Sequence, residues 1–360
     1  MFIVDAHQDI AYNALCYGRD YRTSALKKRT QEAGSDIPAR AGVATLGLPE
    51  ALVGRVAVVF ATLFVAPRSR GAAPSPWADL EYDDAAGAHR LARQQLDVYR
   101  RLVDEDDRLR LIRSAADLDA VLATWQPGVD VRQRRQGLVL LMEGADPIVE
   151  PPQFEEWYEL GVRAVGPAWQ RTRYAGGTRA PGPLTALGHE LLDVMAGFNA
   201  MLDLSHLAER SYYDAIEQYT GTIIASHSNP RKFCDTDRHL SDDMIRRLAD
   251  RDGVMGVVLA NYFLDGGWQG SDGKRAVTLD RVLEIVDHIC QVTGSAAHVA
   301  IGSDFDGGFG AETIPAEIDT VADLWRFQEG LLGRGFSEAD TEAILSGNML
   351  RQLRKSLPAT

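Results

Sequence analysis

The sequence has few cysteines, no excess of basic residues and no long apolar run, and each absence narrows the possible functions. Its 360 residues include only three cysteines, Cys16, Cys234 and Cys290, which lie far apart and form no C-x-x-C pair. Neither a disulfide framework nor a thiolate zinc site is therefore expected. Lys and Arg number 38 against 51 Asp and Glu, whereas binding to a nucleic-acid backbone needs a basic surface. A nucleic acid is thus not the expected partner.

The chain also lacks the segments that direct proteins to membranes or to secretion. No apolar stretch reaches the length of a membrane span, and the opening MFIVDAHQD has no basic region followed by a long apolar one. We therefore expect a cytoplasmic protein that does not bind a membrane. The apolar fraction of 45% is ordinary for a globular fold, and a chain of this length can form one large barrel domain.

Short apolar runs alternate along the chain with longer amphipathic segments. The apolar runs predict eight strands, at residues 2–6, 56–64, 138–142, 163–167, 200–204, 222–225, 254–260 and 299–302. Helices are predicted at 88–103, 280–294 and 337–353, the last opening with a capping-box pattern at Ser337 and Asp340. Segments 66–77 and 173–185, rich in Gly and Pro, are predicted to be loops. This alternation favours a single (β/α)8 barrel over residues 1–360, with a doubly wound open sheet as the alternative.

Most of the predicted strands end in a residue that can bind a metal ion or transfer a proton. These residues are His7 and Asp9, Glu143, His206, His227, and Asp304 with Asp306. In a parallel barrel the carboxyl ends of all strands lie on one face, where active sites form, so these side chains would meet in one cavity. Taken singly, each has a structural explanation as a buried histidine, a helix cap or a turn residue. Their recurrence at the same end of several strands favours a common site.

Three histidines and two carboxylates form a donor set that suits zinc, and no thiolate is required. We expect two zinc ions, with Glu143 as their bridge because its strand lies between the two ligand groups. His7 and Asp9 would complete one set of ligands, and His206 and His227 the other. A hydroxide between two such ions is a nucleophile at neutral pH. Asp304 could orient that hydroxide and carry its proton to a leaving amine.

The motifs HQD, MEG, DLSH, SHSN and IGSDFDG, in this order, resemble those of the membrane (renal) dipeptidase family of binuclear zinc peptidases. The similarity runs from about Val4 to the GNMLRQL segment near the end of the sequence. The resemblance implies a (β/α)8 barrel that hydrolyses a small dipeptide, often one with a D-residue at its C-terminal position. It also implies that His7, Asp9, Glu143, His206 and His227 bind the metals, and that Asp304 is the general acid/base.

The resemblance extends to substrate-binding residues. The segment RHLSDDMIRRL places Arg238 where the family has an arginine that grips the substrate carboxylate, a task that suits a planar guanidinium. His239 replaces the family's usual asparagine. Asn261 and Tyr262 are candidates for lining the substrate pocket, and segment 173–185 is a candidate lid. Family members often pair, so a homodimer is expected as well.

The largest departure from the family lies at Trp169 and Gln170, which stand in place of a histidine thought to stabilise the oxyanion of the tetrahedral intermediate. An indole N–H donates a hydrogen bond but carries no charge. Losing one oxyanion donor can lower the rate about a hundredfold or more. Trp169, Gln170, Arg171 or Arg173 could take over this role, or Trp169 could form the floor of the pocket.

Three functions remain open on these grounds. The leading one is a metal-dependent dipeptidase. The second is a related barrel metallohydrolase or deaminase that acts on another small amide, lactone or nucleobase. Such enzymes commonly open with H-x-H, whereas Asp9 holds the second position here. The third, suggested by Trp169, is a catalytically weakened barrel that binds a ligand without turning it over.

Overall fold

Eight parallel strands close into a barrel in the computed structural model, which describes residues 1–68 and 77–360. The strands are β1 (Ile3–Gln8), β2 (Val56–Phe64), β6 (Gln136–Glu143), β7 (Val162–Gly166), β10 (Met201–Asp203), β11 (Ile223–Ala225), β12 (Val254–Val257) and β13 (Val299–Ile301). Around the barrel they follow the order β2-β1-β13-β12-β11-β10-β7-β6, and the pairing of β2 with β6 closes the ring. The predicted (β/α)8 barrel is confirmed, and each of these strands overlaps a predicted one.

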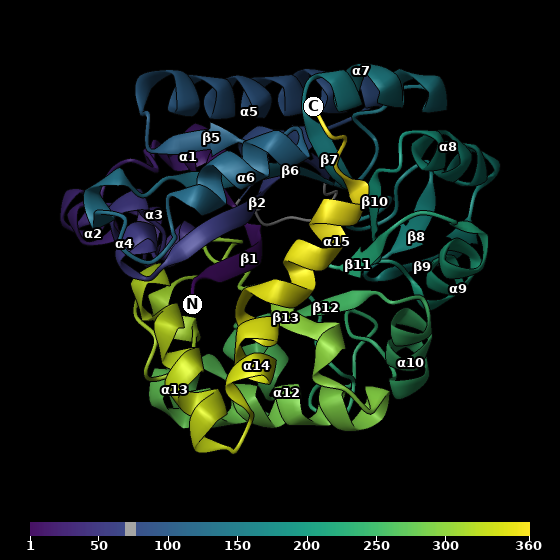
Figure 1. Cartoon of the computed structure of the whole chain (residues 1–360). Coiled ribbons are helices and arrows are strands. Elements are labelled where there is room, and N and C mark those ends of the chain that lie inside the picture. The colour runs from purple at the N-terminus through teal and green to yellow at the C-terminus, as the bar shows by residue number, and fades with distance from the viewer. Residues whose placement is uncertain (69–76) are drawn as a thin grey trace.

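Helices surround the barrel (Figure 1). They are α1 (Ile10–Tyr17), α2 (Ala25–Glu32), α3 (Ile37–Ala41), α4 (Leu48–Val53), α5 (Ala85–Glu105), α6 (Ala115–Ala123), α7 (Phe154–Glu159), α8 (Ala186–Gly197), α9 (Glu209–Gln218), α10 (Asp242–Asp250), α11 (Asn261–Leu264), α12 (Leu279–Thr293), α13 (Arg326–Gly333), α14 (Glu338–Glu342) and α15 (Asn348–Ser356). Within the two described ranges, no helix combines the length and the apolar character needed to cross a bilayer.

The predicted helices at 88–103 and 280–294 correspond to α5 and α12. The one predicted at 337–353 is helical but not uniform, because the π-helical segment Ala343–Gly347 separates α14 from α15. Ser337 caps α14, since its Oγ accepts from the backbone N–H of Asp340 at 3.0 Å and donates to the Asp340 carboxylate at 2.7 Å. This pair therefore caps the helix as predicted, although the Asp340 carboxylate accepts its hydrogen bond from the Ser337 hydroxyl.

Alternate residues of β6 point to opposite sides of the sheet. Val139 and Leu141 belong to the cluster that fills the barrel interior, whereas Leu140 and Met142 belong to the larger cluster beneath the surrounding helices. Glu143 continues the interior series at the carboxyl end of the strand. The two-residue period of a strand thus directs this carboxylate into the barrel mouth.

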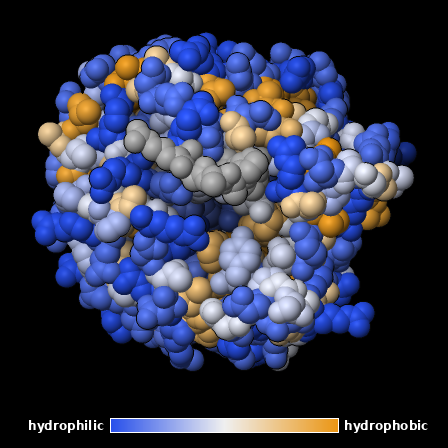
Figure 2. Space-filling view, turned by 180° about the vertical axis from the view of Figure 1, so that it is seen from behind, coloured by the Kyte–Doolittle hydropathy of each residue, from blue (hydrophilic) through white to orange (hydrophobic). Residues whose placement is uncertain are grey.

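The two ends of the barrel differ. At the end where the strands begin, Met349 and Leu353 of α15 pack with Val4 of β1 and Val58 of β2, and Figure 1 shows α15 lying across this end. The opposite side of the molecule is hollowed near its centre, as Figure 2 shows. The closed end stabilises the fold, and the hollowed end, where the strands finish, is available for a site.

Five short strands were not predicted, and they are β3 (Ala66–Pro67), β4 (Glu81–Tyr82), β5 (Leu109–Leu111), β8 (Ala175–Gly177) and β9 (Ala180–Leu184). The loop prediction for 173–185 is wrong, because β8 and β9 form an antiparallel hairpin. A Cβ on Gly176 would lie 2.5 Å from the backbone N of Gly182, so glycine allows the hairpin strands to approach closely. Of the loop predicted at 66–77, residues 69–76 lie outside the described residues.

Candidate metal centre and active site

A cavity of about 490 Å³ lies at the end of the barrel where the strands finish, on the side seen in Figure 2. Among the predicted site residues, its lining includes Asp9, Glu143, Trp169, His206, Arg238, Tyr262 and Asp304. The remaining two, His7 and His227, are 0% and 1% exposed and lie against the lining carboxylates. The structure therefore brings these nine predicted residues to one place.

Strand β1 is irregular where it delivers its residues to the cavity. Val4 and Ala6 face the barrel interior, and strict alternation would direct His7 away from it. The pairing register of β1 with β2 shifts between Asp5 and Gln8, which breaks the alternation before the strand ends. Irregularities of this kind re-aim side chains next to active sites.

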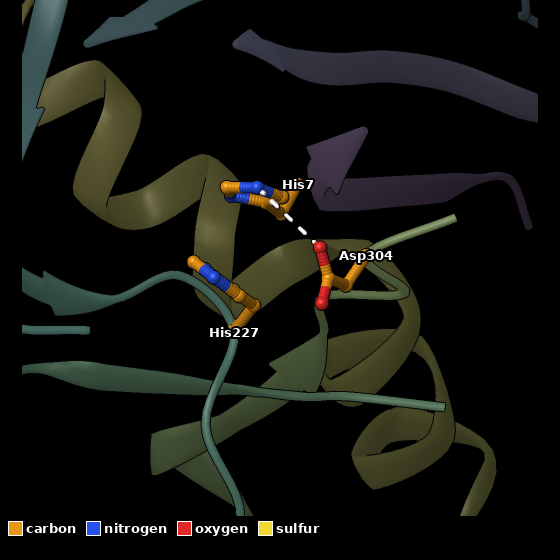
Figure 3. Close-up of side chains that lie close together, drawn as sticks. All are labelled: His7, His227 and Asp304. Atoms are coloured by element: carbon orange, nitrogen blue, oxygen red, sulfur yellow. Dashed lines mark ion pairs between the residues drawn. The ribbon is translucent and has the colours of Figure 1, made fainter. Parts of the chain in front are cut away.

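His7 and Asp9 form the first half of the site. His7 Nε2 lies 3.5 Å from Asp9 Oδ2 and 3.7 Å from Asp304 Oδ1, the contact drawn in Figure 3. Thr62 Oγ1 donates to Asp9 Oδ1 at 2.7 Å. Neither ring nitrogen of His7 has a hydrogen-bond partner among the described residues. This buried imidazole thus has an unused nitrogen facing carboxylates.

His206 and His227 form the second half, at the ends of β10 and β11. Their Nε2 atoms lie 3.0 Å apart and 3.1 and 3.3 Å from Glu143 Oε1. The other nitrogen of each ring meets a hydroxyl, Thr178 Oγ1 at 3.0 Å for His206 and Ser226 Oγ at 2.7 Å for His227. Both rings are therefore oriented from behind and present Nε2 to the same carboxylate oxygen.

Glu143 joins the two halves. Its Oε1 faces His206 and His227, and its Oε2 lies 3.6 Å from His7 Nε2. Two overlapping groups of ligand atoms, one made by His7, Asp9 and Glu143 and one by Glu143, His206 and His227, each fall within 4.8 Å. In the ring of strands, β6 lies on the short arc between β1 and β10, separated from them by β2 and β7. Glu143 can therefore reach the residues that follow β1 as well as those that follow β10.

The site concentrates negative charge in a buried place. Burial raises the pKa of Glu143 to about 8 and the pKa of Asp304 to about 7. For His7, burial lowers the pKa, but Glu143 and the neighbouring carboxylates outweigh it and raise the value to about 10. Burial holds the pKa of His206 and of His227 well below the usual range. The carboxylates thus require positive charge nearby, while two of the imidazoles stay neutral and can donate lone pairs.

The residues present fit a pair of divalent cations. Neutral imidazole nitrogens and carboxylate oxygens are the donors that zinc and similar ions accept without thiolates. The unpartnered nitrogens of buried His7 and the Nε2 atoms of His206 and His227, 3.0 Å apart, are the groups that such ions would satisfy. Cations would also supply the positive charge that the carboxylates lack.

Asp304 stands at the cavity edge in a left-handed conformation, with φ of 60°. Its backbone N–H donates to the carbonyl of His7 at 3.1 Å. A Cβ at Gly307 would lie 2.4 Å from Asp304 Oδ1 and 2.8 Å from Asp9 Oδ2, so a side chain there would displace both carboxylates. Asp306 serves a separate purpose, because its carboxylate accepts from the N–H and the hydroxyl of Thr45.

Arg238 is 4% exposed and lines the cavity. Its Nη2 donates to the carbonyl of His227 at 2.6 Å, and its Nε has no hydrogen-bond partner among the described residues. Tyr262 also lines the cavity. Asn261 does not belong to the lining, because it is fully buried and donates to the carbonyl of Lys274 at 3.4 Å. The prediction that Asn261 lines the pocket is therefore wrong, whereas Tyr262 lies in the lining as predicted.

Trp169 forms part of an aromatic wall. Its ring meets Phe64 and Trp77 edge-on, with centroids 5.1 Å away in each case, and lies 6.2 Å from the ring of His206. Gln170 lines the cavity beside it. The two arginines considered as substitutes for the family histidine point elsewhere, since Arg171 donates to the carbonyl of Pro181 and Arg173 to those of residues 148 and 149.

Several lining residues were missed in the sequence. Trp77 and Phe64 belong to the aromatic wall, and Thr178 and Arg179 form the turn of the β8–β9 hairpin that reaches the cavity. The backbone N–H of Arg179 donates to Asp237 Oδ2 at 2.7 Å. The glycines around this turn were the available signal, since a hairpin there directs its tip toward the barrel mouth. The predicted lid segment thus contributes to the wall of the cavity.

Known proteins with similar sequences include a bacterial protein and a mammalian dipeptidase. A protein encoded in the pqqA 5′ region of Klebsiella pneumoniae, described as uncharacterized, is 32% identical over 279 residues, which are 72% of this chain and 94% of that protein. Dipeptidase 3 of Rattus norvegicus is 27% identical over 278 residues, or 74% of this chain, and the match spans about half (52%) of the rat protein.

Two crystal structures share the fold over nearly the full chain. The dipeptidase AC, a metallo peptidase of family M19, superposes with a TM-score of 0.80 at 24% identity and covers 100% of this chain and 99% of its own. A metallo peptidase from Rhodobacter sphaeroides, liganded with a phosphinate mimic of the dipeptide L-Ala-D-Ala, gives a TM-score of 0.78 at 24% identity with 99% of each chain covered.

A sequence model of a protein family also matches almost the whole chain. The model of the membrane dipeptidase family (peptidase family M19) matches residues 1–357. The motifs that placed His7, Glu143 and Asp304 at strand ends lie within that match. The chain belongs to the membrane dipeptidase family of metallopeptidases, peptidase family M19.

Proposed function

We propose that this chain is a dipeptidase that holds two zinc ions through His7, Asp9, Glu143, His206 and His227. The observation that carries the proposal is the placement of Glu143, whose two carboxylate oxygens face separate histidine groups in one cavity. When bound, the ions would supply Lewis acidity and lower the pKa of water to near neutrality. The protein's own groups then bind the substrate and move the proton.

Asp304 is the proposed general acid/base. It lines the cavity with Oδ1 3.7 Å from His7 Nε2, and a carboxylate beside the proposed metal ligands can accept a proton from water and release it again. In the proposed reaction it takes the proton of the attacking water and passes it to the amine that leaves when the peptide bond breaks. Its backbone is held to β1 by the hydrogen bond from its N–H to the carbonyl of His7.

Arg238 is the proposed anchor for the substrate's C-terminal carboxylate. It is buried at the cavity wall, and its Nε lacks a hydrogen-bond partner among the described residues, so an anion would satisfy it. Trp169 and Tyr262 would contact the rest of a small dipeptide. The L-Ala-D-Ala mimic bound to the Rhodobacter sphaeroides relative supports a substrate with a D-residue at its C-terminal position.

The test is a panel of L,L and L,D dipeptides assayed with added zinc and with a chelator, alongside metal analysis of the purified chain. Two zinc ions per chain and chelator-sensitive hydrolysis of a dipeptide are expected. Two ions with hydrolysis of another small amide or lactone, and not of dipeptides, would favour the related hydrolase. Binding of an intact dipeptide without turnover would overturn the proposal.

That last outcome has one observation in its favour. Trp169 occupies the place of the family histidine, and neither Arg171 nor Arg173 lines the cavity. A neutral donor at this position stabilises a developing oxyanion less than a charged one. Slow turnover with tight binding would follow if Trp169 and Gln170 do not replace the histidine.

Three further expectations are part of the proposal. Residues 1–360 are proposed to act as one catalytic unit, with the chain in the cytoplasm and paired as a homodimer. Light scattering of the purified protein and fractionation of cells would check the pairing and the location. A monomer or a membrane-bound protein would contradict these two points without affecting the site.

A further inference from the structure

A chain of hydrogen bonds runs behind His227. Asp203, at the end of β10, is 1% exposed. Its Oδ2 accepts from Ser226 Oγ at 2.5 Å, and its Oδ1 accepts from the backbone N–H groups of Ser226 at 2.8 Å and Ser205 at 3.0 Å. Ser226 Oγ lies 2.7 Å from His227 Nδ1. The carboxylate, the hydroxyl and the imidazole thus form a continuous line from the barrel wall to the proposed metal centre.

The direction of these bonds follows from counting protons. A serine hydroxyl has one proton to donate, and a carboxylate has none. Ser226 donates its proton to Asp203, so it can only accept from His227. Nδ1 of His227 must therefore carry the ring proton, and Nε2 must carry the lone pair. Nε2 is the nitrogen that lies 3.3 Å from Glu143 Oε1.

We propose that Asp203 is a positioning residue that acts through Ser226 to hold His227 in the tautomer whose Nε2 can bind a metal ion. The inference rests on the proposed role of His227 as a metal ligand. Partners that fix the tautomer of a ligating histidine are known to affect metal affinity about 10- to 100-fold. The groups that carry the effect lie on two neighbouring strand ends, β10 and β11, which pair with each other.

The substitution Asp203→Asn would reverse the chain of hydrogen bonds. The amide oxygen of the new side chain would have to face the two backbone N–H groups from which Asp203 Oδ1 now accepts hydrogen bonds. The amide NH2 group would then face Ser226 Oγ. Ser226 would become an acceptor on that side and would turn its proton toward His227 Nδ1. The ring proton would move to Nε2, which could no longer bind a metal ion.

Ser205 does not offer the hydroxyl an easy alternative. Ser205 Oγ lies 3.4 Å from Ser226 Oγ, farther than the 2.5 Å contact to Asp203. It already accepts from the backbone N–H of His227 at 3.0 Å. The 2.7 Å contact between Ser226 Oγ and His227 Nδ1 is much shorter, so His227 is the better acceptor for the Ser226 proton.

The chain offers a matched control in Asp5. Asp5 is also fully buried, and it accepts from the N–H and the hydroxyl of Ser303 at 2.8 and 2.6 Å. Its hydrogen bonds reach no imidazole nitrogen. Asp5→Asn therefore removes a comparable buried carboxylate from the same end of the barrel without acting on a histidine tautomer.

The experiment combines zinc binding with NMR of the histidine rings. Asp203→Asn, Ser226→Ala, Asp5→Asn and the unaltered chain are loaded with zinc, and the affinity for each ion is measured by competition with a chelator. Long-range proton–nitrogen spectra of the metal-free, 15N-histidine-labelled proteins report which ring nitrogen carries the proton, with His227→Gln used to assign the signals.

Asp203→Asn should move the His227 proton from Nδ1 to Nε2 and weaken one ion about 10- to 100-fold. Ser226→Ala should weaken it less, because no group then imposes the wrong tautomer. Asp5→Asn should lower thermal stability but leave the His227 tautomer and the affinity of the ion at His227 unchanged. The inference is overturned if Asp203→Asn keeps the His227 tautomer and both affinities, or if Asp5→Asn shifts the His227 tautomer equally. If the unaltered chain binds no ion that His227→Gln removes, the proposed function fails, while the tautomer comparison still tests Asp203.

Discussion

The two halves of the site are held in place by different means. The rings of His206 and His227 are oriented by hydroxyls at 3.0 and 2.7 Å, whereas neither nitrogen of the His7 ring has a hydrogen-bond partner among the described residues. His7 instead lies in a fully buried strand, and its ring centroid is 3.6 Å from that of His227. Side-chain hydrogen bonds orient both histidine rings of one half, whereas backbone and packing hold the histidine ring of the other. We therefore expect the halves to respond differently to mutation.

Glu143→Gln should break both halves at once and gives the largest expected effect. An amide can still occupy the space, but it removes the charge that both histidine groups face. Loss of both ions and of measurable dipeptide hydrolysis is expected, as checked by metal analysis and by assay. Retention of two tightly bound ions would show that Glu143 is not their bridge.

His206→Ala and His7→Ala should each remove one ion, but not to the same degree. In His7→Ala the ion at the hydroxyl-oriented pair should remain close to its normal affinity, because His206, His227 and Glu143 are untouched. In His206→Ala that pair is broken, and the remaining ion depends on His7, whose ring lacks an orienting partner among the described residues. Stepwise zinc titration of both variants measures this, and equal residual affinities would remove the distinction between the halves.

Asp304→Asn should leave both halves intact while stopping the proton transfer. We expect two ions per chain and a kcat lowered about 10²- to 10⁴-fold, the range for loss of a general acid/base. Metal content and steady-state kinetics on a cleaved dipeptide provide the measurement. Unaltered turnover would mean that another group carries the proton.

The metal-free chain should become less stable as the pH rises from about 7 to about 8, whereas below pH 6.5 the lowered pKa values of His206 and His227 act in the opposite direction. Burial raises the pKa of Glu143 from 4.5 to about 8, so across this interval the folded chain keeps a proton that the unfolded chain has released. This stabilisation is complete below pH 4.5 and is lost as the pH passes 8. A pKa rise of this size corresponds to a few kcal/mol.

Urea unfolding of chelator-treated protein at several pH values checks this trend. The raised pKa of His7 acts in the same direction, so the free energy of unfolding should continue to fall above pH 8. Zinc should remove the decline, because cations replace the protons. A stability that rises with pH above about 7 in the absence of metal would contradict the assignment of Glu143 and His7 as buried groups with raised pKa values.

The smallest effects should come from two threonines, one in each half. Thr178→Val removes the hydroxyl beside His206 Nδ1, and Thr62→Val removes the one that donates to Asp9 Oδ1. Each should weaken one ion about tenfold, and the ion affected should differ between the variants. Competition with a chelator distinguishes the two sites. Weakening of the same ion in both variants would show that the two halves do not bind separate ions.

The barrel and the core of the site could be predicted because both follow from local patterns. Each apolar run was long enough to define a strand, and a residue such as Glu143 or His227 marked its carboxyl end. His7 and Asp9 lie together as expected, with Nε2 and Oδ2 3.5 Å apart. Their placement depends on more than a regular strand, since Asp9 follows β1 and the β1 register shifts just before it.

The walls of the cavity could not be predicted in the same way. Trp77 and Arg179 reach it through segments whose course depends on tertiary contacts, such as the bond from Arg179 N–H to Asp237. The direction of Arg171 and Arg173 is set by distant carbonyls, including that of Pro181. The β8–β9 hairpin was missed because Gly and Pro, which usually mark loops, here permit a close approach of two strands.

The helix that plugs the barrel has a consequence for folding. Helix α15 follows all eight barrel strands in the sequence, yet Met349 and Leu353 pack beside Val4, in the first strand. During synthesis the end of the barrel where the strands begin must therefore stay uncovered until every strand has left the ribosome. Nascent chains that stall before this helix would expose an apolar opening, which makes them natural clients for chaperones.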